Sequence, residues 1–151
     1  MEKMEKQIVM EKEFVPNPLA LKMKALGFDE PCIACYTQNA YGSNKDQKIQ
    51  YWHSPIDGNN DYVFVLAPTW QSAFRWFREK YNWQHSIDPT SDQHSFELGY
   101  NYWIWNYKTG EEYHTMPKNR PTGDWEFETY EEAELACLTK LIEIVENEKM
   151  L

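Results

Sequence analysis

Apolar residues recur at three- and four-residue steps in three stretches of the chain, a spacing that predicts three amphipathic helices. We expect these helices over 18–26, 69–81 and 129–149. The last pattern is the longest, and its apolar stripe consists of Leu135, Leu138, Leu141, Ile142 and Val145.

Capping residues predict where two of these helices begin or end. Thr129 and Glu132 have the spacing of a capping box, in which each side chain accepts a hydrogen bond from the other residue's backbone N–H. Asn17 is a good N-cap, and the following Pro18 suits the first helical position, where no N–H is needed. Gly27 suits the left-handed position that follows the last turn of a helix.

The stretches between the helices alternate runs of β-branched and aromatic residues with turn residues, which predicts strands. The run 62–66 is apolar throughout, which is typical of a central strand. Short turns favour antiparallel pairing. The expected strands cover 31–37, 48–54, 62–66, 83–88, 95–108 and 111–116, with a shorter one at 125–128.

The resulting order, α-β-β-β-α-β-β-β-α, predicts an α+β fold with one or more antiparallel sheets covered by helices. A length of 151 residues fits one domain, which we expect to cover residues 14–151. Residues 1–13 are mostly charged and repeat Met-Glu-Lys, so they are expected to form a flexible extension.

Charge and cysteine content narrow the choice of partners and location. The net charge is −9, which disfavours nucleic acid and anionic membranes as partners. Apolar runs are short, as in 63–67, and the N-terminus lacks the pattern of a signal peptide. Three cysteines, an odd number, indicate reduced thiols. We therefore expect a cytoplasmic protein that does not enter a membrane.

Motifs for catalysis or metal binding are absent from the sequence. Cys32 and Cys35 form Cys-x-x-Cys, but a zinc site usually needs a second pair or two suitably spaced histidines. Small buried cysteines in a strand are the expected alternative. The turn 57–61 lacks the glutamate spacing of a calcium loop. Because nucleophile, P-loop and Rossmann patterns are also missing, we predict no catalytic residue, metal or cofactor.

Two groups of aromatic residues are candidate binding sites. Trp103 and Trp105 lie two residues apart, so a regular strand places both on one face as an aromatic platform, unless helices cover both faces of the sheet. Trp76 lies off the apolar stripe of its helix between Arg75 and Arg78, a combination enriched at protein interfaces. The alternative is that Trp76 packs against a neighbouring loop.

Three blocks of sequence, in this order, resemble a family of small uncharacterised proteins from gut bacteria and their phages. The blocks are LALKMKALGFDEPC at 19–32, APTWQSAFRWFREKY at 67–81 and TYEEAELACLTKLIEIV at 129–145. The resemblance covers most of the chain after residue 10. It implies an intracellular location and a mobile-element origin, and it implies no activity, cofactor or catalytic residue.

Residues 69–147 also resemble double-stranded RNA-binding domains in their α-β-β-β-α order. That family holds phosphates with lysines at the start of its last helix. The matching positions here are Glu131, Glu132 and Glu134, whose carboxylates repel phosphates. The resemblance therefore concerns the topology of this half of the chain and not RNA binding.

The leading hypothesis is a non-enzymatic accessory protein that binds another protein through an aromatic surface patch around Trp76 or around Trp103 and Trp105. One alternative is a module that binds RNA or single-stranded nucleic acid, which requires a basic face on the helix 69–81. The other alternative is an enzyme, which requires a deep pocket where histidines or carboxylates converge.

Overall fold

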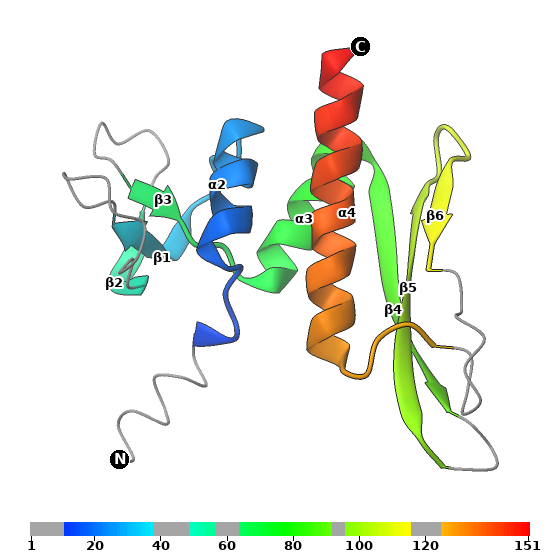
Figure 1. Cartoon of the computed structure of the whole chain (residues 1–151). Helices are drawn as coiled ribbons and strands as arrows, with labels where there is room; N and C mark the ends of the chain where they lie inside the picture. The colour runs from blue at the N-terminus through cyan, green and yellow to red at the C-terminus, as the bar shows by residue number, and fades with distance from the viewer. Residues whose placement is uncertain (1–10, 38–48, 57–63, 92–95, 116–124) are drawn as a thin grey trace. The chain divides into compact units, whose positions relative to one another are not determined.

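The computed structural model describes residues 11–37, 49–56, 64–91, 96–115 and 125–151 (Figure 1). Most of the expected N-terminal extension and the turn 57–61 lie outside the described residues. The order of elements is the predicted one, so the α+β fold is confirmed. The elements are α2 (Asn17–Ala25), β1 (Cys32–Thr37), β2 (Ile49–Ile56), β3 (Phe64–Leu66), α3 (Trp70–Tyr81), β4 (Trp83–Ser91), β5 (Leu98–Asn106), β6 (Glu112–His114) and α4 (Tyr130–Met150).

The chain forms two compact units, Met1–Trp76 and Phe77–Leu151, and the boundary between them falls inside α3. Each unit contains its own three-stranded antiparallel sheet. The two units subdivide the stretch 14–151 that is expected to form one domain, and each is described by itself.

The sheet of the first unit has the order β2-β1-β3, so β1 is the central strand. The prediction that the third strand is central is therefore wrong, because β3 lies at the edge. Its apolar character has another cause. Val65 is fully buried and Leu66 nearly so, although β1 is the only strand that β3 pairs with in the described part of the sheet. Since α2 packs near β3, burial of the strand comes from packing on its faces.

The two ends of α2 differ in how well local sequence predicts them. Gly27 has a φ of 95°, and the Phe28 N–H donates a 2.9 Å hydrogen bond to the Met23 carbonyl, so the glycine end is confirmed. Asn17 does not cap the helix. It is the first helical residue after Pro16, and its Oδ1 is buried without a hydrogen-bond partner in the described part of the chain.

The segment before α2 is attached to the rest of the first unit by hydrogen bonds. The Trp70 indole N–H donates to the Lys12 carbonyl (2.9 Å), and the Val15 N–H donates to the Pro68 carbonyl (2.9 Å). The Tyr36 hydroxyl donates to the Val15 carbonyl (2.8 Å). These bonds place residues 12–15 next to the start of α3.

The sheet of the second unit is a meander in the order β4-β5-β6, so β5 is the central strand. Pairing between β4 and β5 is unbroken from Trp83↔Asn106 to Ser91↔Leu98. It continues through Pro89, beyond the predicted end of this strand at residue 88. Proline is tolerated because β4 is an edge strand, where an N–H that points away from the sheet has no partner to lose.

The start of α4 follows the predicted capping box in one of its two hydrogen bonds. The Glu132 N–H donates to the Thr129 hydroxyl (3.2 Å). The Glu132 carboxylate accepts instead from the Glu128 N–H (3.1 Å), one residue before the expected donor. Leu135 of the predicted apolar stripe is 42% exposed. The buried residues of α4 are Ala133, Cys137, Leu138, Leu141, Ile142, Ile144 and Val145.

Candidate functional site

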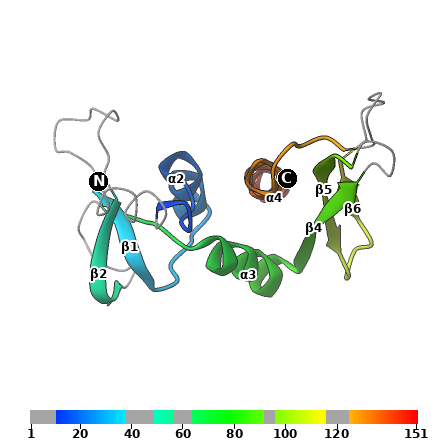
Figure 2. The same ribbon diagram turned by 90° about the horizontal axis from the view of Figure 1, so that it is seen from below.

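The sheet of the second unit has one face covered by α4, and its other face, called the open face below, is covered by Trp125 at Gly99 but exposed at Trp103. Figure 2 shows α4 beside one face of this sheet. Ile104 is fully buried, whereas its neighbour Trp103 is 43% exposed. Because side chains alternate along a strand, Trp103 and Trp105 share the face opposite Ile104, as predicted. The alternative that helices cover both faces therefore fails at Trp103.

Trp103 lies at the centre of the open face, since β5 is the central strand. Its indole ring lies next to that of Trp105, with ring centroids 5.0 Å apart and planes inclined by 43°. Register places Ser86 of β4 directly opposite Trp103 on one side and His114 of β6 directly opposite on the other. Such cross-strand neighbours have Cβ atoms about 4.5–5.5 Å apart.

Two carboxylates occupy diagonal positions on opposite sides of Trp103. Asp88 lies two residues after Ser86 and pairs with Asn101, while Glu112 lies two residues before His114 and pairs with Trp105. Diagonal neighbours in a sheet are about 7–8 Å apart, within reach of long side chains. Both carboxylates therefore border the space above the Trp103 ring.

These side chains enclose an open hollow with a volume of about 340 Å³, lined by Asp88, Asn101, Trp103, Glu112 and His114 among others. Asn101 holds the rim of the hollow together. Its Oδ1 accepts hydrogen bonds from the Thr115 hydroxyl and from the Glu126 N–H, both at 3.1 Å. The hollow therefore has a fixed polar wall beside an exposed aromatic ring.

Asp88, Glu112 and His114 are site residues that no motif in the sequence singles out. Asp88 is the last residue of its predicted strand, and Pro89 is predicted to begin a turn. In the structure β4 continues, and Asp88 points to the same face as Trp103 by alternation from Ser86. The period-two pattern of Glu112 and His114 was visible in the sequence, but the register that brings them beside Trp103 was not.

The other predicted anchor, Trp76, belongs to the core. It is only 4% exposed, and its ring packs edge to face against Phe28 with centroids 5.4 Å apart. The prediction of a surface anchor at Trp76 is therefore corrected. It fails because Phe28, which follows α2 in the first unit, covers the side of α3 that the helical pattern assigns to solvent.

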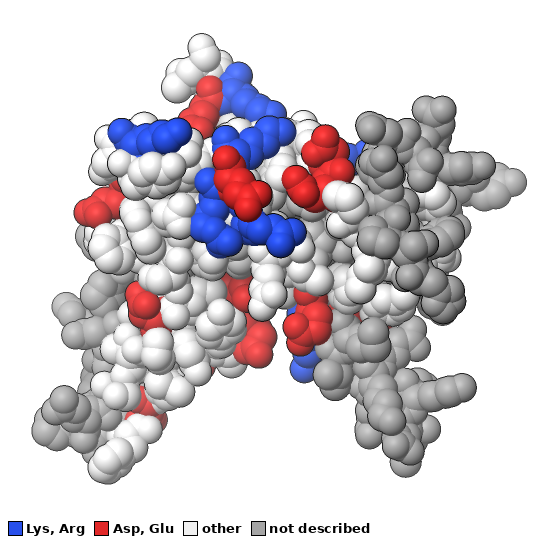
Figure 3. All heavy atoms as spheres, turned by 180° about the vertical axis from the view of Figure 1, so that it is seen from behind, with Lys and Arg blue, Asp and Glu red and all other residues white. Residues whose placement is uncertain are grey.

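The basic residues of α3 do not line one face of that helix. Arg75 and Arg78 lie three residues apart and share a side, whereas Lys80, two residues beyond Arg78, projects elsewhere. Figure 3 shows Lys and Arg side chains beside Asp and Glu side chains on the same face of the protein. Arg75 is exposed and Arg78 is half-buried.

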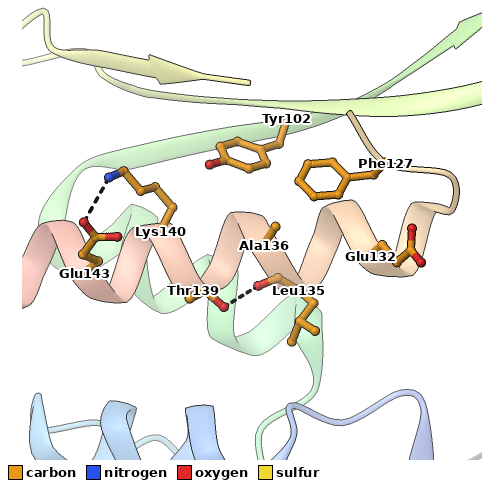
Figure 4. Close-up of a pocket in the computed structure, with 8 residues that line it drawn as sticks. All are labelled: Tyr102, Phe127, Glu132, Leu135, Ala136, Thr139, Lys140 and Glu143. Atoms are coloured by element: carbon orange, nitrogen blue, oxygen red, sulfur yellow. Dashed lines mark hydrogen bonds and ion pairs between the residues drawn. The ribbon is translucent and has the colours of Figure 1, made fainter. Parts of the chain in front are cut away.

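A second hollow lies on the covered side of the sheet, between α4 and β5 (Figure 4). Tyr102 and Phe127 stack with centroids 6.0 Å apart and form the sheet side of this groove, which has a volume of about 490 Å³. The helix side includes the exposed Leu135 and, at one end, the Lys140–Glu143 ion pair (3.2 Å). The groove is largely apolar and presents no convergent set of polar groups.

The histidines do not meet in a deep pocket in the described part of the chain. His85 lies on the covered face, where it is the cross-strand neighbour of Ile104. Burial, followed by the positive charge of Arg78, lowers the pKa of His85 to about 4, so this imidazole is neutral near pH 7. His114 is exposed on the open face. His94 and the side chain of His53 lie outside the part of the chain that the structure describes.

The cysteines match the expectation of small buried residues. Cys32, Cys35 and Cys137 are all buried free thiols. Burial, with added repulsion from Glu30 and Cys35, raises the pKa of Cys32 to about 12, and burial also raises the pKa of Cys137. Thiols held in the protonated form are poor nucleophiles and poor metal ligands. The described residues contain no cluster of His, Cys, Asp or Glu that could hold a metal ion.

Among the helices described, none combines the length and apolar character that crossing a bilayer requires. Comparison of the chain with family models, with curated proteins and with solved structures found no match. The open face of the second sheet is the candidate functional site.

Proposed function

We propose that the chain is a non-enzymatic intracellular accessory protein that binds another protein through the open face of its second sheet. The observation that carries this proposal is the 43% exposure of Trp103 in the central strand of that sheet. A large aromatic side chain in a central strand is normally covered, and exposed aromatic surface rimmed by polar groups is typical of protein interfaces. Here the rim consists of Asp88, Glu112 and His114.

The exposure of the polar residues around the hollow supports binding over catalysis. Asp88, Glu112 and His114 are the kinds of residue that perform acid-base chemistry, but all three are exposed. Catalytic groups usually depend on burial or close charges to adjust their pKa values and exclude water. An open, wet rim around an indole ring is better suited to recognising a partner.

The nucleic-acid alternative has less support from the structure. The charged residues at the start of α4, Glu131 and Glu132, are exposed carboxylates at the positions where the resembling family carries lysines. Arg75 and Arg78 provide only a short basic row on α3, and Lys80 does not extend it. A phosphate backbone would therefore meet repulsion on α4 with little compensation on α3.

The proposal is tested by affinity capture with the full-length protein as bait in a lysate of its source organism. The captured protein is identified by mass spectrometry and its affinity is then measured with purified components. Trp103→Ala is expected to weaken binding by about tenfold or more, as for a central aromatic anchor. Trp76→Ala is unsuitable because Trp76 is a core residue.

Tyr130→Ala provides the matched control. Tyr130 is also 43% exposed and belongs to the same unit, but it starts α4 and packs against Tyr100 on the covered side of β5. Partner binding that survives Trp103→Ala at wild-type affinity, in a variant with an unchanged circular dichroism spectrum, would refute the role of this face.

A further inference from the structure

The hollow around Trp103 is acidic as well as aromatic, and these two properties together select a class of partner group. Asp88 and Glu112 line it, and none of the described residues that line it is Lys or Arg. An aromatic face next to negative charge attracts a cation, both through the ring quadrupole and through the carboxylates.

We infer that this hollow receives an arginine side chain of the partner protein, with the guanidinium stacked on Trp103 between Asp88 and Glu112. The inference rests on the proposed function and specifies the chemistry of the partner. It differs from general electrostatic attraction to the net charge of −9, because it requires one indole ring and two named carboxylates.

The carboxylates are available to an incoming donor. Asp88 is exposed, and the only hydrogen bond it accepts from the described residues comes from the Ser86 hydroxyl (3.0 Å). Glu112 is exposed, and its carboxylate makes no hydrogen bond or ion pair with a described residue. Because neither carboxylate is neutralised by a described lysine or arginine, a positive group from a partner gains both attractions.

The geometry favours arginine over lysine. Asp88 lies on β4 and Glu112 on β6, the two strands that flank Trp103 of β5. The two carboxylates are diagonal neighbours of Trp103 on its two sides. A guanidinium is planar and stacks on an indole face, and the N–H groups on its edges point towards the rim where the carboxylates lie. An ammonium is compact and strongly hydrated, and it forms a contact at one point.

Two features of the hollow orient the incoming side chain. Trp105 lies beside Trp103 and extends the aromatic surface along β5, which gives room for the aliphatic part of an arginine. On the opposite side, Asn101 is held by Thr115 and Glu126, so that wall remains in place when a ligand enters. The hollow is therefore largely formed before binding.

The test uses the full-length protein and small probes. N-acetyl-arginine amide is titrated while the indole N–H resonance of Trp103 is followed by nuclear magnetic resonance, with assignment from Trp103→Phe. The neutral isostere N-acetyl-citrulline amide and the lysine counterpart are titrated in parallel. We expect a saturable shift with the arginine probe in the millimolar range, and binding at least about tenfold weaker with citrulline.

Variants then test whether the charges of Asp88 and Glu112 contribute to binding of the arginine probe. Asp88→Asn and Glu112→Gln are each expected to weaken binding of the arginine probe by up to about fivefold, as for exposed ion pairs. The double variant is expected to weaken this binding further. Glu131→Gln, an exposed carboxylate at the start of α4, is the matched control and should leave affinity unchanged. Raising the salt concentration to 1 M should weaken binding of the arginine probe, since the screening length falls to about 3 Å.

Several outcomes would overturn the inference. These are equal affinity for the arginine and citrulline probes, unchanged affinity for the arginine probe in the double variant, or tighter binding of the lysine probe than of the arginine probe. A saturable, salt-independent shift produced by glucose or N-acetylglucosamine would assign the hollow to a carbohydrate instead. If the purified partner is lost with Trp103→Ala but retained by the Asp88→Asn/Glu112→Gln variant, the protein-binding face stands and the arginine inference fails.

Discussion

The indole ring of Trp125 fills the space into which a side chain at position 99 would project. A Cβ added to Gly99 would overlap the Cγ, Cδ1 and Cδ2 atoms of that ring. Trp125 is 2% exposed, and nearby the backbone of Phe127 exchanges hydrogen bonds with Tyr100 at 2.8 and 3.1 Å. Gly99 is thus required by the packing of the segment that leads into α4.

Gly99→Ala is expected to reduce the free energy of unfolding by about 1–3 kcal/mol, because the added methyl group displaces a buried ring. The measurement is denaturant unfolding followed by circular dichroism. In a Trp125→Leu background the same substitution should cost much less, since two groups in contact do not contribute additively.

Gly110→Ala separates this steric cost from backbone strain. Gly110 has a φ of 77° with no atom near the added Cβ, so alanine there meets only the penalty of the left-handed conformation. That penalty should be the same with or without Trp125→Leu. A Gly99→Ala cost that is also independent of Trp125 would contradict the packing argument.

Thr129→Ala is expected to destabilise the start of α4 by about 1 kcal/mol, because the Glu132 N–H loses the hydroxyl that accepts its hydrogen bond. Thr129→Ser keeps the acceptor and should preserve stability. Chemical denaturation of the two variants under the same conditions makes the comparison. Equal stability of the alanine and serine variants would show that the cap contributes nothing measurable.

The buried His85 predicts a stability that depends on pH. Its pKa falls from 6.5 to about 4 on folding, so the unfolded chain binds more protons between these values. The stabilising contribution is therefore complete above pH 6.5 and is lost as the pH falls towards 4, by up to about 3 kcal/mol.

The difference between wild type and His85→Gln isolates this contribution. Glutamine does not titrate, so the loss of unfolding free energy between pH 7 and pH 4.5 should be smaller in the variant. Measurements by urea unfolding across this range would show parallel curves if His85 were accessible to protons in the native state.

All three cysteines are expected to resist alkylation in the native protein, because each is buried and the pKa values of Cys32 and Cys137 are raised. Mass spectrometry after treatment with iodoacetamide at pH 8 should find little adduct without denaturant and up to 3 adducts with it. Rapid native modification of Cys32 or Cys35 would reopen a redox role for the Cys-x-x-Cys pair.

Features encoded by neighbouring residues could be predicted from the sequence. The helix end at Gly27, the cap at Thr129 and the shared face of Trp103 and Trp105 each depend on spacings of a few residues. The order of strands could not be read in this way, since β3 shows the apolar pattern of a central strand but lies at an edge.

The candidate site was only half predictable for the same reason. Trp103 follows from alternation within β5, but Asp88 and Glu112 reach it through the register of two other strands. The burial of Trp76 depends on Phe28, which is distant in sequence. Both relationships arise from tertiary packing, about which helical or strand periodicity carries no information.

Pro89 has a consequence for the behaviour of the chain at high concentration. It lies in a nine-residue edge strand, and a long edge strand offers its free backbone groups to a second copy of itself. Replacing Pro89 with Val restores a donor and adds a strong strand former, so we expect concentration-dependent assembly detectable by light scattering. We therefore expect the proline to protect the chain against ordered aggregation through this edge strand.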